Sequence, residues 1–150
     1  MTTTPLSRPR PPARAVRLPS GWVSFDPASP PDDLVPGLPA AVGVLAAVTP
    51  RRLPASGSRP ALVLARSSTP TDVDASLLDE DDHFLDDGGR TVRYRRWQAA
   101  TDLRTVCESW AWAAADGTET ALLAAVDIAD YSCFTDVFET VAESVDPEAF

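Results

Sequence analysis

The sequence contains no lysine and no asparagine, and it has only one isoleucine, Ile128, and one histidine, His83. All thirteen basic residues are therefore arginine, whereas alanine, aspartate, proline and valine are abundant. Lysine, asparagine and isoleucine have AT-rich codons, so this composition is typical of a high-GC bacterial genome. We interpret the missing lysines as mutational bias and infer no function from them.

Cysteines and long apolar runs are also scarce. The two cysteines, Cys107 and Cys133, are too few for a disulfide framework. The N-terminus has arginines but neither the apolar region of a signal peptide nor a lipid-attachment cysteine. The longest apolar stretch, residues 38–48, is shorter than the ~20 residues that span a bilayer, and it contains Pro39 and Gly43. We therefore expect a cytoplasmic protein with two free thiols.

The charge balance is strongly acidic. The chain has 22 aspartates and glutamates and a net charge of −9. Such a surface repels phosphate backbones and anionic lipid headgroups, so we expect no nucleic-acid partner and no membrane partner. Cationic protein partners remain compatible with this charge.

The length of 150 residues suits one domain that needs neither a metal nor a disulfide for stability. Residues 1–17 contain four arginines, four prolines and no acid, and little that could be buried. We predict that residues 1–17 form a disordered Pro/Arg-rich arm. The remaining residues, 18–150, are predicted to form a single domain.

Apolar patterns and turn signals give a coarse secondary structure for this domain. Short strands are predicted at 22–25, 61–67 and 91–98, and a short helix at 72–78. Residues 40–49 fit either a helix or a strand, because Gly43 makes the pattern ambiguous. The acidic stretch 79–87 is interpreted as a solvated loop that ends at Gly88-Gly89.

The most informative local signal is Asp116-Gly117, between two runs of strand character. This dipeptide predicts a two-residue type I′ hairpin, with Trp112 opposite Ala121 and Trp110 opposite Leu123. The apolar stripe of residues 132–145 predicts a C-terminal helix that ends before Pro147. We expect this helix to pack on the small residues beside Cys107, leaving Trp110 and Trp112 on the other face of the sheet.

These segments resemble the PsbP/Mog-type family, and in particular its LpqN-like branch of bacterial lipoproteins. The resemblance rests on Leu18-Pro-Ser-Gly-Trp22, on ALVLARSSTP at residues 61–70, and on TALLAAVDIADYSCFTDVFETVAESV at residues 120–145. It implies an α+β fold in which helices pack on an antiparallel sheet as an α/β/α sandwich. It also implies a binding or assembly protein without a shared catalytic site. The lipoprotein signal of that branch is missing here.

No residue pattern predicts catalysis, a cofactor or a metal. Cys107 and His83 could pair as nucleophile and base, but a buried thiol and a solvated histidine are the simpler interpretation. Cys107, Cys133 and His83 do not have zinc-ligand spacing. The aspartates of residues 79–87 lack the spacing of a calcium loop. We therefore expect a non-enzymatic protein with no cofactor.

The candidate binding residues are aromatic and basic, because tryptophan and arginine are enriched at interaction hot spots. They are Trp97, Trp110, Trp112, Arg93 and Arg95, with Glu108 on the same expected face. The alternative interpretation is that this face is covered and the tryptophans are core residues. The first hypothesis is that the chain is an accessory module that binds a protein partner. In a secretion-associated setting it would be an adaptor. We expect a monomer or a weak homodimer. The alternative is an acidic immunity-type inhibitor of a cationic toxin or enzyme. A hydrolase that uses Cys107 is the weakest hypothesis.

Overall fold

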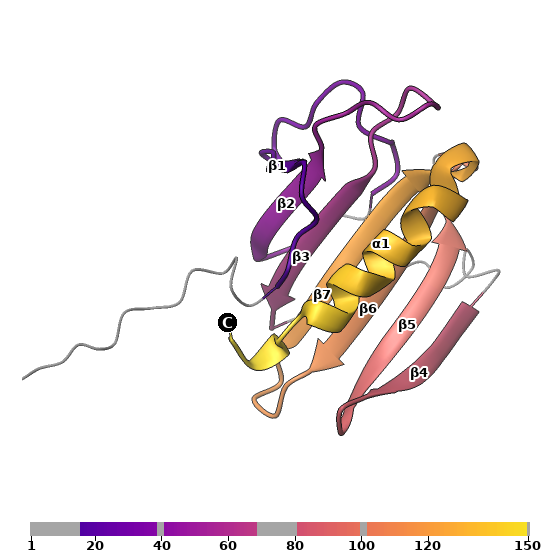
Figure 1. Cartoon of the computed structure of the whole chain (residues 1–150). Coiled ribbons are helices and arrows are strands. Elements are labelled where there is room, and N and C mark those ends of the chain that lie inside the picture. The colour runs from indigo at the N-terminus through magenta and orange to yellow at the C-terminus, as the bar shows by residue number, and fades with distance from the viewer. Residues whose placement is uncertain (1–15, 39–40, 69–80, 100–101, 150) are drawn as a thin grey trace, which may run out of the picture.

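Seven antiparallel strands form one sheet in the computed structural model, which describes residues 16–38, 41–68, 81–99 and 102–149 (Figure 1). The strand order is β1-β2-β3-β7-β6-β5-β4. The strands are β1 (Trp22–Ser24), β2 (Val44–Pro50), β3 (Ala61–Ser67), β4 (Asp81–Asp87), β5 (Arg90–Gln98), β6 (Thr105–Ala113) and β7 (Glu119–Asp127). The helix α1 (Tyr131–Ser144) follows a 3₁₀ turn at Ile128–Asp130, and a second 3₁₀ turn spans Pro147–Ala149.

The predicted α/β/α sandwich is wrong. Within the described ranges there is a single α-helix, α1, and it lies on one face of the sheet (Figure 1). The ambiguous segment 40–49 contributes strand β2, not a helix, and the predicted helix at 72–78 falls outside the described residues. In the described part of the chain, no helix has the length and apolar character needed to cross a bilayer.

Residues 81–87 of the acidic stretch that was predicted as a loop form strand β4, at the edge of the sheet. Gly88 and Gly89 have φ angles of 59° and 87°, and Asp87 pairs with Arg90 across them, so they form the two-residue turn of a β4–β5 hairpin. Two acids of β4 are balanced by arginines of β5, since Asp81 pairs with Arg96 and Asp82 pairs with Arg93. Cross-strand charge pairs and edge position together explain how so acidic a segment forms a strand.

The β6–β7 hairpin has a three-residue loop in place of the predicted two-residue turn. The Ala114 amide donates to the Thr118 carbonyl (2.8 Å), and Gly117 takes a φ of 87° inside the loop. The extra residue moves the register by one, so that Trp110 lies opposite Leu122 and not Leu123. A one-residue slip turns every side chain of one strand to the other face relative to its partner.

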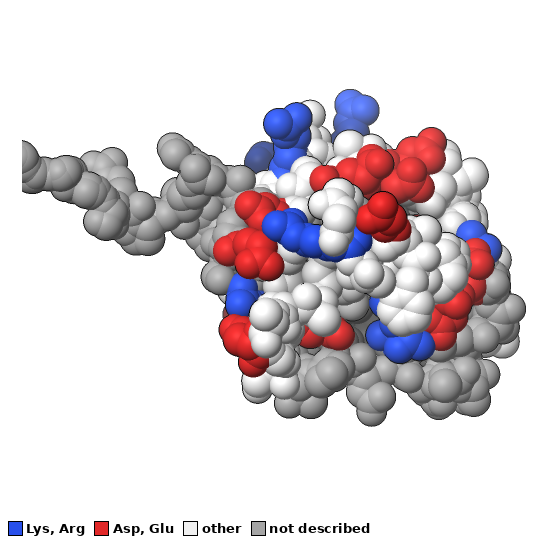
Figure 2. Space-filling view, turned by 90° about the horizontal axis from the view of Figure 1, so that it is seen from below, with Lys and Arg blue, Asp and Glu red and all other residues white. Residues whose placement is uncertain are grey.

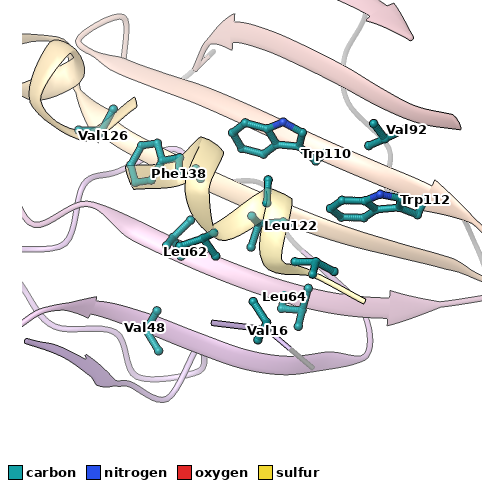
Figure 3. Close-up of a cluster of buried hydrophobic side chains, with 14 of the residues drawn as sticks. Val16, Val48, Leu62, Leu64, Val92, Trp110, Trp112, Leu122, Val126 and Phe138 are labelled. Carbon is teal, nitrogen blue, oxygen red and sulfur yellow. The ribbon is translucent and has the colours of Figure 1, made fainter. Parts of the chain in front are cut away.

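This register places Trp110 and Trp112 on the same face as α1, contrary to the prediction that they face away from it. Both tryptophans join Leu122 and Phe138 in one buried cluster. Figure 3 shows the two indoles on one side of the helix and Leu62, Leu64 and Val16 on the other. Strand β7 turns Leu122, Ala124 and Val126 toward the helix as predicted, so the error lies in β6 alone.

The opposite face of the sheet is covered by loop residues. Val35 and Leu38 pack against Trp97, Cys107 and Ala125. Leu38 also joins a neighbouring cluster built around Ala47, Val63 and Leu123. A backbone hydrogen bond from Val35 to Arg59 (2.9 Å) holds the start of this loop in place.

The last two residues of the predicted arm, Val16 and Arg17, contact the folded domain. Val16 is buried in the main cluster, and the Arg17 amide donates to the Ser144 hydroxyl (2.8 Å) near the end of α1. Leu18 and Trp22 pack against the same cluster. The segment from Val16 to Trp22 therefore contributes to the core on the α1 side of the sheet. Residues 1–15 of the predicted arm lie outside the described residues.

Phe138 is expected to be the main anchor of α1, because its side chain is fully buried. Truncation in Phe138→Ala removes these contacts and leaves a cavity, so the free energy of unfolding should fall by ~3–5 kcal/mol. Chemical denaturation measures the loss. The exposed neighbour Thr140 serves as the control, and Thr140→Ala should stay within ~0.5 kcal/mol of the wild type. Equal effects of the two substitutions would contradict this role of Phe138.

Gly43 should tolerate no side chain. Its φ is +70°, and an added Cβ would lie 2.0 Å from the Arg66 carbonyl oxygen, whereas Gly57, with a φ of +84°, has open space. Gly57→Ala should cost only the backbone strain of ~1–2 kcal/mol. Gly43→Ala should cost a further ~1–3 kcal/mol from overpacking. Thermal and chemical denaturation of both variants test this difference.

Candidate functional site

A groove of about 630 Å³ lies between α1 and the strands β4, β5 and β6. One helix is about 10 Å wide and strands are about 4.8 Å apart, so α1 can cover only about two strands. Figure 1 shows α1 in front of β7 and β6, with β5 and β4 uncovered on this side. On the β2–β3 side the gap is filled by residues 16–22, whose Val16, Leu18 and Trp22 join the core. The β4–β5 side has no such cover among the described residues, and the groove lies there.

Glu108 of β6 lines this groove, and only 3% of the residue is exposed. The Tyr94 hydroxyl of β5 donates a hydrogen bond to its Oε2 atom. The Thr135 hydroxyl of α1 donates to its Oε1 atom at 3.2 Å. Because the two donors come from a strand and from the helix, Glu108 ties both walls of the groove together.

Aromatic rings line the groove on either side of Glu108. The rings of His83 and Tyr94 are 5.4 Å apart, and those of Tyr94 and Trp110 are 5.3 Å apart. They form a row because directly opposite residues of antiparallel strands share a face, and His83, Tyr94 and Trp110 are opposite one another across β4, β5 and β6. On the helix side, Tyr131 accepts a hydrogen bond from Arg96 (3.0 Å), whose guanidinium lies 5.8 Å from the Tyr131 ring centre.

Burial raises the pKa values of both Glu108 and Tyr94. Desolvation raises the pKa of Glu108 above its ordinary value, although hydrogen bonds from Tyr94 and Thr135 and the charge of Arg96 oppose the rise. Burial and the hydrogen bond to Glu108 also raise the pKa of Tyr94. Tyr94 therefore keeps its proton and remains a hydrogen-bond donor to Glu108 throughout the physiological range.

Acidic side chains dominate the rest of the lining. Asp136, Glu139 and Glu143 project from α1, and Asp86 comes from the end of β4. The three helix acids are exposed and have no ion pair or side-chain hydrogen bond within the described ranges. Other acids are neutralised by arginines, as in Asp82–Arg93 (2.8 Å) and Asp33–Arg59 (2.8 Å). Figure 2 shows acidic patches with arginines between them on the end of the molecule seen from below.

The five predicted binding residues do not share one face. Trp110 and Trp112 are 5% and 2% exposed and lie beside α1 on the same face of the sheet, where they line the groove (Figure 3). Trp97 is buried on the opposite face with Cys107 and Ala125. The predicted exposed tryptophan face is therefore wrong, because the register of β6 turns it toward the helix.

The two arginines of the predicted set belong to the face opposite α1. Arg93 and Arg95 alternate with Tyr94 along β5, so they share the side of Trp97. Arg95 is only 7% exposed. Arg93 makes a two-point ion pair with Asp82 (2.9 and 2.8 Å), and its guanidinium lies 5.9 Å from the centre of the exposed Phe84 ring.

The geometry contradicts the hypothesis that Cys107 and His83 pair as nucleophile and base. Cys107 faces the loop-covered side, where its thiol lies 3.8 Å from the Gly37 carbonyl, whereas His83 lines the groove on the helix side. Burial raises the pKa of Cys107 to about 12, so its reactive thiolate is scarce at neutral pH. Both cysteines are free. No metal-binding group of three His, Cys, Asp or Glu side chains occurs in the described part of the chain.

The sequence predicts neither the burial of Glu108 nor the role of Tyr94. The sequence pattern places Glu108 beside arginines on an open face, and it assigns Tyr94 no role. A signal was present, because Glu108 is the only charged residue in the otherwise uncharged strand Thr105–Ala113. A carboxyl in such a strand is buried together with the groups that satisfy it.

The raised pKa of Glu108 makes a signed prediction about stability. In the unfolded chain, Glu108 has its ordinary pKa of 4.5, and in the folded chain its pKa is higher. Glu108 therefore supports folding most at a pH below 4.5. Its contribution is lost as the pH rises through the folded pKa. Glu108→Gln keeps the shape without the charge and should therefore gain stability relative to the wild type from pH 4 to pH 8. Denaturation of both proteins across this range tests the trend, and a constant difference would contradict it.

Comparisons with known proteins support the fold alone. No protein-family model and no curated protein matches this sequence. Among solved structures, the solution structure of cyanobacterial PsbP (CyanoP) from Synechocystis sp. PCC 6803 is similar, with a TM-score of 0.52 and 14% sequence identity. The match covers 84% of this chain and 81% of that protein. The chain therefore has a PsbP-like fold.

Proposed function

We propose that this chain is a non-enzymatic accessory module that binds a protein partner in the groove between α1 and the β4–β5 hairpin. The observation that carries the proposal is the groove itself, which is lined by Tyr94, Trp110, Trp112 and Tyr131 and is left open by a helix too narrow for the sheet. Tyr94 and Tyr131 are partly exposed, whereas Trp110 and Trp112 are buried behind them. Exposed tyrosine rings supply contact area at low entropic cost, which favours them at binding sites. In this proposal the chain is cytoplasmic, acts as a secretion-associated adaptor and is related to the LpqN-like branch.

The rigid attachment of the groove residues favours binding without prior rearrangement. Tyr94, Trp110 and Trp112 are on β5 and β6, which pair with each other along their lengths. Thr135 and Tyr131 are on α1, which Phe138 anchors to the core. A site on such elements binds at a lower entropic cost than a site on loops.

An acidic immunity-type inhibitor is the alternative function, and the unpaired acids Asp136, Glu139 and Glu143 favour it. The acidic strand β4 is a less suitable contact for an inhibitor, since Asp81 and Asp82 pair with Arg96 and Arg93. An inhibitor steered by charge should associate several-fold more slowly at high salt. A partner held in the groove, where part of the contact is with aromatic rings, should show a smaller change in association rate.

Blocking the groove should abolish partner binding. Glu139 lines the groove and Glu148 does not, and both are exposed, so Glu139→Trp and Glu148→Trp make the same change inside and outside the site. Affinity capture from an extract of the host cells compares both variants with the wild type. At least one protein retained by the wild type and by Glu148→Trp should fall at least tenfold with Glu139→Trp.

Circular dichroism and the melting temperature first establish that both variants are folded. Capture of the same proteins in the same amounts by all three chains would contradict the proposed function. Loss of the partner with Glu148→Trp alone would place the binding surface outside the groove and would equally contradict it.

A further inference from the structure

We infer that the groove recognises an arginine side chain of the partner, seated between the aromatic row and the acids of α1. This inference rests on the proposed function and specifies the chemistry of its ligand. Five carboxyl groups line the groove among the described residues, against Arg96 as the only arginine there. They are Asp86, Glu108, Asp136, Glu139 and Glu143.

The first argument is unbalanced charge. Arg96 is already held by Asp81 (3.3 Å) and by the Tyr131 hydroxyl (3.0 Å). The acids Asp136, Glu139 and Glu143 have no cation partner in the described part of the chain. Like charges on one helix face are destabilising at three- and four-residue spacing, so a bound cation would relieve their repulsion. The groove therefore favours a positively charged ligand.

The second argument selects arginine among cations. A guanidinium is planar and weakly hydrated, and it can stack on an aromatic ring while its N–H groups bind carboxylates. The groove offers both kinds of contact, since the partly exposed ring of Tyr94 lines it together with the exposed carboxyl groups of α1. Trp110, 5.3 Å from Tyr94, and Glu108 are buried behind them. The chain already makes this combination once, since Arg96 lies over the Tyr131 ring and pairs with Asp81.

The third argument is access and size. The cavity volume of about 630 Å³ is within the range of small-ligand sites and exceeds what one arginine side chain needs. Glu108 is buried, whereas Glu139 and Glu143 are exposed on the outer wall. An entering side chain would meet the exposed acids first and the aromatic rings and Glu108 further in.

The test uses three blocked tripeptides, Ac-Gly-Arg-Gly-NH₂ and its lysine and citrulline counterparts, with the full-length chain. Citrulline has the shape of arginine without its charge. NMR titration follows the indole N–H signals of Trp110 and Trp112, which line the groove. The arginine peptide should shift these signals in a saturable way, with an affinity at least tenfold above that of the citrulline peptide and several-fold above that of the lysine peptide.

Charge variants separate the groove from general electrostatic attraction. Glu139→Gln/Glu143→Gln should weaken binding of the arginine peptide about three- to tenfold. The control Asp32→Asn/Glu148→Gln removes the same charge from exposed positions outside the groove and should stay within about twofold. Glu108→Gln should weaken binding about tenfold, and the surface pair keeps the test valid if that variant fails to fold.

Four outcomes would overturn the inference: no saturable shift with the arginine peptide, equal affinity for arginine and citrulline, equal affinity for arginine and lysine, or an equal loss in the control pair. The proposed function fails differently. If the arginine peptide does not bind but Glu139→Trp still loses its captured protein, the groove binds a partner by other chemistry. If the peptide binds and capture is unaffected by Glu139→Trp, the groove is not the partner site.

Discussion

The pairing of β6 with β7 is the constraint on which the rest of this structure depends. The three-residue loop before Thr118 places Trp110 opposite Leu122, which turns both central tryptophans toward α1. In the register of a two-residue turn, those indoles would face the loop-covered side and Cys107 would face the helix. One residue in a loop therefore decides which of two side-chain sets forms the main core.

The groove follows from that core and from the unequal widths of its two layers. Phe138 and the residues after it attach α1 over β7, and the segment from Val16 to Trp22 covers the β2–β3 side of the same face. The β4–β5 hairpin extends the sheet past the edge of the helix. Trp110 thus has two roles, since it belongs to the buried cluster and also lines the groove.

Charge is distributed by the same geometry. Strand β4 is acidic and its neighbour β5 is rich in arginine, so the edge of the sheet is largely neutralised by cross-strand pairs such as Asp82–Arg93. The acids of α1 face no such arginines within the described ranges. A PsbP-like fold does not specify what a protein binds, because function depends on the site and not on the fold. The unpaired acids beside aromatic rings are the feature of this chain that bears on what it binds.

Local patterns in the sequence determined the elements whose signals are strong. The runs at 61–67 and 91–98 form β3 and β5, and the apolar stripe at 132–145 forms α1, because burial of one face imposes a readable period. The acidic strand β4 was missed because its stability comes from arginines on another strand, and Gly88-Gly89 was interpreted only as the end of a loop. Pairing of that kind is a property of two segments and is absent from either one alone.

The site depended almost wholly on tertiary structure. The sequence shows which residues are aromatic or charged, but the register of the β6–β7 hairpin decided that Trp110 and Trp112 face the helix while Trp97, Arg93 and Arg95 face away. The two alternative registers differ by one loop residue, and both leave plausible apolar faces. Only the burial of Phe138 in one cluster with Leu122 and the tryptophans distinguishes them, because contacts between distant segments carry the energy that selects one register.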